Sequence, residues 1–352
     1  MSSKSIFMGD KRIVVNHSNF ISEPIFLVGA DRSGTTVTRL MLAHHPQLAL
    51  CSELSYTVEK VSETGEYPPL EEYYEYLETQ RIFQASGFKI DRSLNYQELV
   101  NSFLYQYQQK AGKPLIGSTV HLHFDRLVEI WPNARFIHLV RDGRDVARSW
   151  IGMGWGGTVW NGLQGWIEAE TCWERLKAKI KPQQWTEIHY EDLILDPVST
   201  LTKACNFIGI SFDKAMLNYS ETSPYDTPNP KLVQQWRHKL SEYEIRLLES
   251  QISDFLVERD YELSGLPPLK LNPVTEQIVR LKDWWGRSQF RLDRYGLGLL
   301  LSNHLSRYLG LKQWHKQVKI EMNNIEHSLI QMSEQRKMEQ KQLQKTASTV
   351  WE

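Results

Sequence analysis

The octet Gly29-Ala-Asp-Arg-Ser-Gly-Thr-Thr36 decides the fold, because it separates an apolar run from a segment with helical spacing. The run Ile25-Phe-Leu-Val28 is bounded by Pro24 and Gly29, and a short apolar run of this kind predicts a buried strand. After the octet, residues 36–44 carry apolar side chains at helical spacing. A glycine-containing loop between a strand and a helix places backbone N–H groups where they can hold a phosphate.

The octet has the glycine spacing of a nucleotide-binding P-loop but lacks its lysine. Gly29 and Gly34 are separated by four residues, and a Lys followed by Ser or Thr would then be expected. Thr35 occupies the lysine position, and the cation of the loop is Arg32 instead. Since that lysine normally contacts the β- and γ-phosphates, its loss argues against ATP or GTP hydrolysis. A guanidinium beside a row of hydroxyls suits a single 5′-phosphate that carries a sulfate, although an ordinary strand–turn–helix connection is the simpler alternative.

A second anion site is predicted at Arg141, directly after the apolar run 135–140. Ligands of open α/β sheets bind at the carboxyl ends of the strands, and Ser149 follows about two turns into the next helix. Asp145 is a candidate helix cap, and a surface ion-pair cluster of Asp142 and its neighbours is the alternative. Together with the octet, this site predicts a nucleotide with phosphates at two separate positions.

The rest of the chain predicts an α/β fold: a P-loop-like parallel sheet flanked by helices, with a helical C-terminal extension. Further strands are predicted at 114–118, 135–140 and 186–190, and helices at 96–109, 123–130 and from Asp145. We divide the chain into a lead-in at 1–23, a catalytic domain at 24–266 and the extension at 267–352. Within the extension, 295–311 is typical of an amphipathic helix, and the residues after Glu334 are expected to be disordered. These helices make a homodimer a further expectation.

Composition excludes several classes of protein. A formal net charge of −1 gives no electrostatic reason to expect a nucleic-acid partner. Three cysteines without metal-ligand spacing predict neither a disulfide framework nor a metal site, and a reducing, cytoplasmic location is expected. No apolar run is long enough to predict a transmembrane segment.

At these motifs the sequence resembles the sulfotransferases that use 3′-phosphoadenosine 5′-phosphosulfate (PAPS), especially the branch of the tyrosylprotein enzymes and many bacterial members. The resemblance covers about residues 24–263 and includes Tyr190-Glu-Asp-Leu followed by Asp196-Pro197. It implies transfer of the sulfuryl group to an acceptor hydroxyl or amine by in-line displacement, leaving PAP. It also implies which residues contact PAPS: Arg32, Ser33, Gly34, Thr35 and Thr36 at the 5′-phosphosulfate, Arg141 and Ser149 at the 3′-phosphate, and Tyr190 near the adenine.

The resemblance also suggests the catalytic base. Glu53 follows His45-Pro46 at the distance that the tyrosylprotein branch shows for its catalytic Glu. His121 and His123 are rival bases, because an unperturbed His titrates near neutral pH. Ser118 stands where many relatives carry a lysine, so the cation that stabilises the leaving group is not identified, and either histidine could take its place. Two other functions stay open at this point: a P-loop kinase of small molecules, and a catalytically degenerate nucleotide-binding scaffold.

Aromatic residues between 150 and 173 form a further candidate feature. Five tryptophans interleaved with glycines suit the wall of an acceptor pocket, and core packing or an oligomer interface is the alternative. By resemblance, the segment from Pro224 to Lys239 could close over PAPS.

Overall fold

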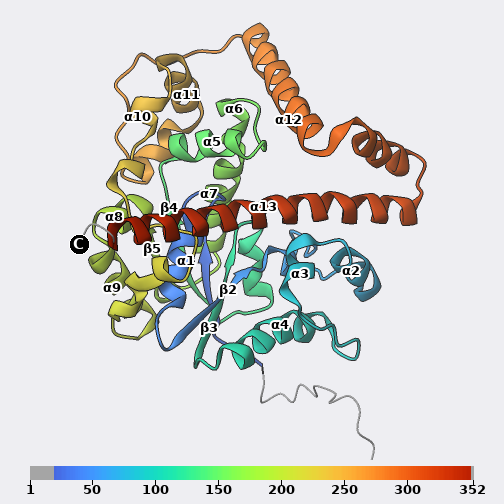
Figure 1. Ribbon diagram of the computed structural model, residues 1–352, viewed down its shortest axis with the longest axis vertical. Coiled ribbons are helices and arrows are strands. Elements are labelled where there is room, and N and C mark those ends of the chain that lie inside the picture. Colours follow the sequence, from blue (N-terminus) through green and yellow to red (C-terminus); the bar gives the residue numbers. More distant parts are fainter. Residues whose placement is uncertain (1–19, 350–352) are drawn as a thin grey trace, which may run out of the picture.

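The computed structural model describes residues 20–349, and five parallel strands form its sheet in the order β2-β3-β1-β4-β5 (Figure 1). The strands are β1 (Ile25–Val28), β2 (Leu48–Glu53), β3 (Leu115–Val120), β4 (Arg135–Val140) and β5 (Trp185–His189). In the register of the central strands, Ile25 lies opposite Gly117 of β3 and Arg135 of β4. A Cβ at Gly117 would lie 1.8 Å from the Ile25 carbonyl oxygen, so only glycine allows this close strand pairing.

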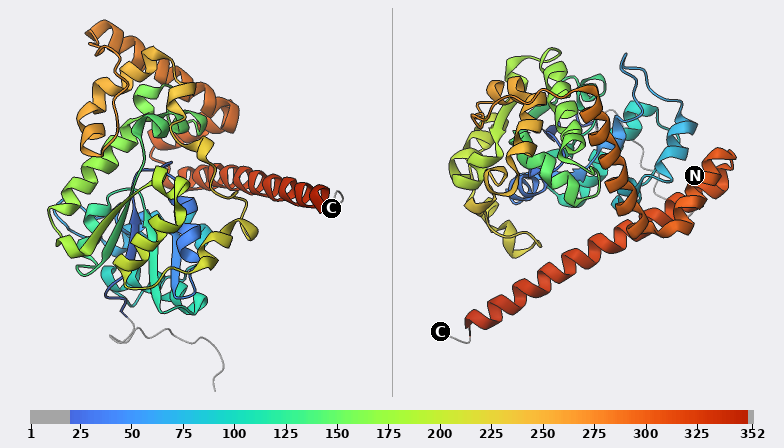
Figure 2. Two further views of the ribbon diagram at one scale, coloured as in Figure 1. Left: turned by 90° about the vertical axis from the view of Figure 1, so that its left-hand side faces the viewer. Right: turned by 90° about the horizontal axis from the view of Figure 1, so that it is seen from above.

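Helices cover both faces of the sheet, as expected for parallel strands whose residues are buried on both sides (Figures 1 and 2). Along β1, Phe26 and Val28 join the larger apolar cluster, whereas Ile25 and Leu27 join the smaller one. The larger cluster is formed with α4 (Tyr96–Ala111), η3 (Phe124–Glu129), α7 (Gln164–Lys177) and α11 (Glu242–Glu258). The smaller cluster is formed with α1 (Thr35–Ala43), α8 (Tyr190–Leu195), α9 (Pro197–Ile208) and η5 (Lys214–Glu221). The predicted α/β class is confirmed.

The sequence motifs lie at one edge of the sheet, at the ends of three neighbouring strands. The loop after β1 opens α1, the loop after β4 opens α5 (Gly143–Gly152), and β5 runs directly into α8. Because β1, β4 and β5 are adjacent and parallel, the octet, Arg141 and Tyr190 all lie at the carboxyl edge.

The C-terminal part consists of two long helices, α12 (Pro273–Tyr308) and α13 (Lys312–Thr349). α12 is broken at Gly296, whose φ is 71°, and α13 runs back across the sheet domain (Figures 1 and 2). The structure thus continues a helix where disorder is expected after Glu334, since Gln, Lys, Glu and Met all favour helix. No helix among residues 20–349 is both long and apolar enough to cross a membrane.

Two local predictions differ from the structure. β2 is not among the predicted strands: its four apolar residues, Leu48-Ala-Leu-Cys51, run into the polar pair Ser52-Glu53 with no glycine or proline to mark that end. The predicted helix at 123–130 is the 3₁₀ segment η3. The remaining elements are short: η2 (Ser55–Thr57), α2 (Leu70–Leu77), α3 (Arg81–Ser86), α6 (Val159–Gly162), η4 (Pro182–Gln184), η6 (Pro230–Leu232) and α10 (Trp236–Lys239).

Candidate active site

The loop between β1 and α1 is shaped to bind an anion. α1 begins at Thr35 without a side-chain cap, and its first helical hydrogen bond runs from Thr38 N to Gly34 O (3.1 Å). The N–H groups of the first turn therefore have no partner within the helix. The Ser33 hydroxyl is buried and makes no hydrogen bond within residues 20–349. Arg32 has a φ of 72°, a strained backbone conformation for a residue with a side chain and one that clusters at functional sites.

The second motif lies directly against this loop. Arg32 Nε donates to Ser149 Oγ over 3.1 Å, and Arg141 Nη1 donates to the Arg32 carbonyl oxygen over 3.1 Å. Arg141 Nε is buried and has no hydrogen-bond partner in the described chain. The two motifs, more than 100 residues apart in sequence, therefore form one polar site with unused donors.

Tyr190 packs between the two motifs. A Cβ on Gly34 would lie 2.3 Å from the Tyr190 ring, so the ring rests on the loop backbone. The Arg141 guanidinium lies 4.3 Å from the centroid of the same ring, a cation–π contact. Burial raises the pKa of Tyr190, which keeps its hydroxyl neutral at physiological pH. Tyr190 thus contacts both the loop and Arg141.

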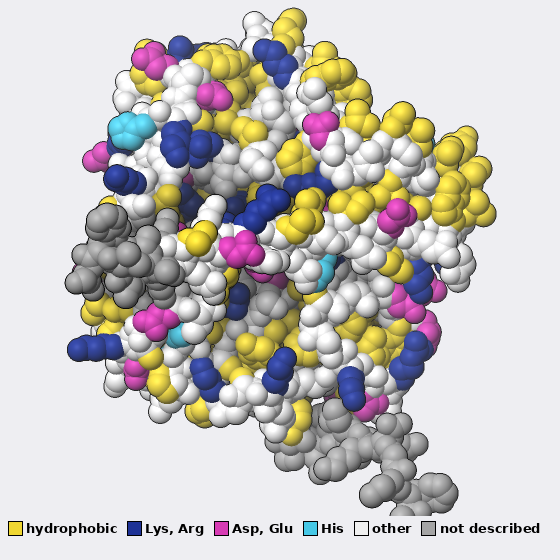
Figure 3. All heavy atoms as spheres, viewed as in Figure 1, with side chains coloured by type: hydrophobic (Ala, Val, Ile, Leu, Met, Phe, Trp, Pro, Cys, Tyr) yellow, Lys and Arg dark blue, Asp and Glu magenta, His cyan; other side chains and the backbone are white. Residues whose placement is uncertain are grey.

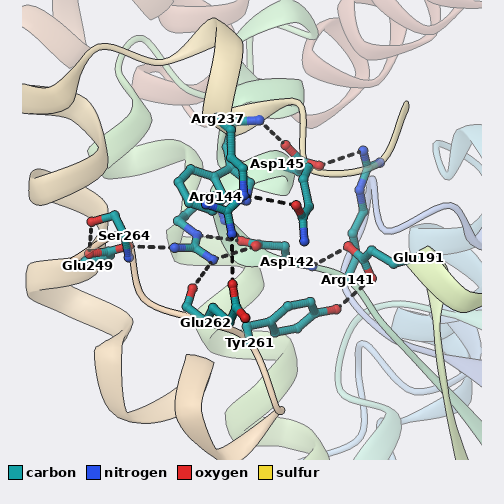
Figure 4. Close-up of polar contacts among 12 residues, drawn as sticks. Arg141, Asp142, Arg144, Asp145, Glu191, Arg237, Glu249, Tyr261, Glu262 and Ser264 are labelled. Carbon is teal, nitrogen blue, oxygen red and sulfur yellow. Dashed lines mark hydrogen bonds and ion pairs between the residues drawn. The ribbon is translucent and has the colours of Figure 1, made fainter. Parts of the chain in front are cut away.

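Figure 4 shows how the residues behind Arg141 hold it in place. Asp145 accepts hydrogen bonds from the backbone N–H groups of Trp236 (2.7 Å) and Gln235 (3.3 Å), and its Oδ2 lies 3.5 Å from Arg141 Nη2. Asp142, rather than the predicted Asp145, caps α5 by accepting from Arg144 N–H (2.9 Å). Asp145 instead anchors the 235–236 backbone beside the site.

The alternative set Asp142 and Asp145 against Arg141 and Arg144 in a surface ion-pair cluster, and the structure contains both pairs, but they are largely buried. Arg144 is fully buried, binds Asp142 (2.7 Å) and Glu249 (2.6 Å), and stacks 3.6 Å from the Trp236 ring centroid. All of its charge is engaged by protein groups. Arg144 is therefore structural, whereas Arg141 keeps a buried donor, Nε, without a partner among residues 20–349.

Glu191 is a buried acid behind the same motif. Its carboxylate accepts from Asp142 N–H (3.2 Å) and from the Tyr261 hydroxyl (2.8 Å). Burial raises the pKa of Glu191 to about 7 despite these two bonds. The group behind the Arg141 motif consequently changes charge near neutral pH.

Glu53 and His121 line a cavity of about 430 Å³ beside the loop. Thr35 and Thr36 of α1 form one wall, and the Thr119 hydroxyl, which lacks a hydrogen-bond partner among residues 20–349, belongs to the same lining. The sequence therefore brings its first candidate base next to the predicted phosphosulfate loop.

Glu53 and His121 have different electrostatic surroundings in this cavity. Burial raises the pKa of Glu53, although the neighbouring His121 opposes this shift. Burial lowers the pKa of His121, but the carboxylates of Asp31 and Glu53 outweigh it, so that the net shift is upward. The His121 Nδ1 atom lies 2.9 Å from the Gly29 carbonyl oxygen, which can only accept, and Nε2 lies 3.7 Å from Asp31 Oδ1. Both ring nitrogens thus face acceptors, which favours the protonated imidazolium.

The structure does not place His123 with these groups. β3 ends at Val120, and His123 takes a left-handed conformation (φ 52°) at the start of η3, so the two histidines do not share a strand face. Burial lowers the pKa of His123, with Arg126 adding to the effect. Ser118 is also turned away, because its hydroxyl donates to the Ser52 carbonyl oxygen (2.7 Å) while the adjacent Thr119 faces the cavity.

Two cations of the cavity were not expected from the sequence. Arg39 of α1 and Arg81 at the start of α3 both line it, and neither guanidinium makes a hydrogen bond or ion pair within residues 20–349. No sequence motif identifies either arginine. Arg81 reaches the cavity because the tertiary fold packs α3 there. The two arginines add positive charge to the lining of the cavity that Glu53 shares.

The residues of α13 that cover the site were also not predicted from the sequence. Ile330 and Glu334 of α13 complete the lining of the Glu53 cavity. Further along, the Lys341 ammonium donates to the carbonyl oxygens of Ser220 and Ser223 (both 3.2 Å) and to that of Tyr225. There α13 covers a second hollow of about 450 Å³ that Tyr190 lines. The C-terminal extension therefore contributes to both hollows at the carboxyl edge.

Some of the tryptophans between residues 150 and 173 pack in the core, and others lie nearer the surface beside the site. Trp166 and Trp173 are fully buried in the core. Trp150 instead donates through Nε1 to the Asp31 carbonyl oxygen (3.3 Å), and Trp155 meets it edge-on with ring centroids 5.3 Å apart. Trp150 thus contacts the octet, whereas Trp166 donates through Nε1 to the Arg141 carbonyl oxygen (2.9 Å).

Comparisons with known proteins agree with this geometry. A model described as the sulfotransferase family matches residues 24–214. The protein-tyrosine sulfotransferase of Drosophila melanogaster is 26% identical over 219 residues, which are 56% of this chain and 40% of that protein. Protein-tyrosine sulfotransferase 1 of Danio rerio is 26% identical over 220 residues, 56% of either chain. This chain thus spans about half the length of these curated relatives.

Among solved structures, the sulfotransferase domain from the curacin biosynthetic pathway has the same fold. It superimposes with a TM-score of 0.51 at 18% identity and covers 69% of this chain and 99% of that domain.

Proposed function

Because the chain belongs to the sulfotransferase family, we propose that it transfers the sulfuryl group of PAPS to an acceptor hydroxyl or amine. The observation that carries this proposal is the Arg32–Ser149 hydrogen bond, which joins the two predicted phosphate motifs in one site. PAPS supplies an activated sulfuryl group and a phosphate leaving group. The residues of the chain then have to bind its two ends, hold its charge and remove the acceptor's proton by in-line displacement.

The unused donors of the site fit such a nucleotide. The buried Ser33 hydroxyl and the first turn of α1 suit a 5′-phosphosulfate, with Arg32 beside them. Arg141 Nε and Ser149 suit the 3′-phosphate, and the hollow beside Tyr190 suits the adenine. Buried polar atoms without partners are costly, so these atoms support a ligand that satisfies them. We assign Gly34, Thr35 and Thr36 to the same 5′ site through their backbone position.

Glu53 is the proposed base and His121 a proposed electrostatic partner. A base has to accept a proton within hydrogen-bond reach of the acceptor, and a carboxylate with a raised pKa performs this more effectively. His121, with both ring nitrogens facing acceptors, suits a positive charge instead. We propose that His121, Arg39 and Arg81 together provide the positive charge that relatives draw from the lysine at the Ser118 position.

The nucleotide is tested by thermal shift. PAP should raise the melting temperature of the protein strongly, whereas ATP at the same concentration should not. A larger rise of the melting temperature with ATP than with PAP would favour the alternative function, a P-loop kinase of small molecules. Labelled PAPS supplied with extracts of sugars, lipids, peptides and phenols then identifies the acceptor, and PAP binding without transfer to any acceptor would favour the degenerate scaffold.

Two finer expectations are part of the proposal. Cys51, Cys172 and Cys205 are buried free thiols, which supports a cytoplasmic location. Within residues 20–349 no cluster of His, Cys, Asp and Glu could hold a metal, and we propose that arginines and backbone N–H groups hold the charge of the reacting group. A homodimer through the C-terminal helices stays a prediction, and analytical ultracentrifugation measures it.

A further inference from the structure

The outer face of α12 carries an exposed apolar stripe. At about 100° per residue, five apolar side chains of its first half fall on one side of the helix. These residues are Val274, Ile278, Leu281, Trp285 and Leu292. Leu281 and Trp285 are 65% and 62% exposed, although side chains of this size are usually covered.

The opposite face of α12 is fixed to the protein, so the stripe has to point outward. Val279 and Asp283 are buried, and Asp283 Oδ1 accepts hydrogen bonds from Gly157 N (2.8 Å) and Thr158 N (3.1 Å). A Cβ on Gly154 would lie 2.0 Å from the Phe290 ring, which shows how closely this inner face packs. Rotation of α12 could not hide the stripe without breaking these contacts.

The apolar surface continues beyond the break at Gly296. Leu297, Leu301, Leu305 and Tyr308 follow at helical spacing, and each is at least 44% exposed. In Figure 3, hydrophobic side chains gather along the outer edge of the molecule where Figure 1 places α12. A contiguous exposed apolar surface of this extent marks an interaction site.

Charge identifies the kind of partner. α12 contains six Lys or Arg against three Asp or Glu, a formal charge of +3, whereas the whole chain carries −1. Lys282 and Arg291 are exposed, make no ion pair within residues 20–349 and project to opposite sides of the stripe. Trp285 lies within the stripe and Trp284 at its border, with ring centroids 6.4 Å apart. Apolar side chains edged by tryptophan and cations are typical of a helix that lies in a membrane interface.

We infer that α12 lies on an anionic lipid surface, with its apolar stripe among the acyl chains and its cations at the headgroups. A second copy of the chain fits less well, because two helices of charge +3 would face each other. Such a helix lies on the membrane and does not cross it, and the carboxyl edge of the sheet would be held near the lipid surface.

Vesicle flotation of the full chain tests this inference. The protein should float with vesicles of phosphatidylcholine and phosphatidylserine in equal amounts, and binding should fall as salt rises. The triple variant Leu281→Gln, Trp285→Gln and Leu292→Gln should lose flotation. The double variant Lys282→Glu and Arg291→Glu should weaken partitioning by about tenfold or more.

The matched control replaces exposed apolar residues elsewhere. Leu195 and Val257 are each 60% exposed and lie outside α12, so the variant Leu195→Gln, Val257→Gln should float as the wild type does. Circular dichroism confirms that each variant is folded. Absence of flotation for the folded wild type, or equal flotation of the triple variant, would overturn the inference. A wild-type dimer that the triple variant converts to a monomer, without vesicle binding, would assign the stripe to a second copy instead.

Discussion

Arg32 donates through Nε to Ser149 Oγ over 3.1 Å, although 117 positions separate the two residues. One belongs to the loop after β1 and the other to the helix after β4, so their contact depends on the adjacency of these strands. In the proposed function, each residue belongs to a different end of one nucleotide. Their contact therefore predicts that the two phosphate sites are energetically coupled.

The coupling is measurable as a double-mutant cycle on PAP affinity. Ser149→Ala should weaken PAP binding by about 1–2 kcal/mol, because one hydrogen bond to a charged group is lost. Arg32→Ala should weaken it further, and the double variant by less than the sum of the two, since contacting residues are not additive. Isothermal titration calorimetry gives the four affinities. Strict additivity would mean that the two residues act on PAP independently.

Arg141→Ala should reduce PAP affinity by at least about 2–5 kcal/mol, because it removes a largely buried cation that we propose pairs with the 3′-phosphate. Arg141→Lys should recover part of the loss, since lysine keeps the charge but lacks the planar fork. Arg280 is the matched control: it is exposed on α12, pairs with Glu276 (2.6 Å) and should be replaceable by Ala without effect on PAP. Unchanged affinity in Arg141→Ala would remove this residue from the site.

Gly34→Ala should abolish PAP binding, because it adds both backbone strain and a clash with the Tyr190 ring. A control at Gly87 separates these two effects. Gly34 has a φ of 93°, and the added Cβ would lie 2.3 Å from the Tyr190 ring. Gly87 also has a positive φ (71°), but a Cβ there would meet nothing within 4 Å. Gly87→Ala should therefore cost only backbone strain, about 1 kcal/mol of unfolding free energy, and leave PAP binding intact. Loss of binding in both variants would show that global stability, rather than the Tyr190 contact, decides the result.

The sequence predicts the parts of the site that local patterns encode. An apolar run, two glycines and a helical segment suffice to place the octet, and the apolar run 135–140 places Arg141 at a strand end. Predicting both at the same edge requires only the rule that parallel strands share their direction. The resemblance adds Glu53, whose strand the local pattern did not reveal.

The remaining parts depend on contacts between distant segments. Arg81 reaches the Glu53 cavity because α3 packs there, and Glu334 because α13 returns across the sheet. His123 lies outside the cavity because the chain turns left-handed after β3; histidine is enriched in this conformation, but the residue type alone does not show where such a turn occurs. No short pattern in the sequence signals these arrangements.

Glu191 makes stability depend on pH. Its folded pKa of about 7 lies above the ordinary value of 4.5, so the neutral form stabilises the fold. That contribution is fully present below pH 4.5 and is lost as pH rises through 7, where the buried carboxylate has to ionise. Relative to Glu191→Gln, the wild type should lose up to about 3 kcal/mol of unfolding free energy between pH 5 and pH 8. Urea denaturation at both pH values measures this, and parallel pH profiles would exclude Glu191 as the cause.

Glu53→Gln tests the proposed base. Gln keeps the shape of the side chain but cannot take a proton, so kcat should fall by about 10²–10⁴ while PAP affinity stays unchanged. In the wild type, kcat should fall as pH drops through the raised pKa of Glu53, because the protonated carboxyl is inactive as a base. This acidic limb should start at higher pH than an unperturbed glutamate would give, and it should vanish in the variant's residual activity.

Two further variants, a control at Glu59 and a substitution of the rival base His121, complete this test. Glu59 also lies close enough to act on Glu53 electrostatically but is hydrogen-bonded by the Tyr76 hydroxyl, so Glu59→Gln should retain most of the activity. His121→Asn should lower kcat yet keep the acidic limb, because the proposed imidazolium supplies charge and not the base. A fully active Glu53→Gln, together with loss of the acidic limb in His121→Asn, would transfer the base role to His121.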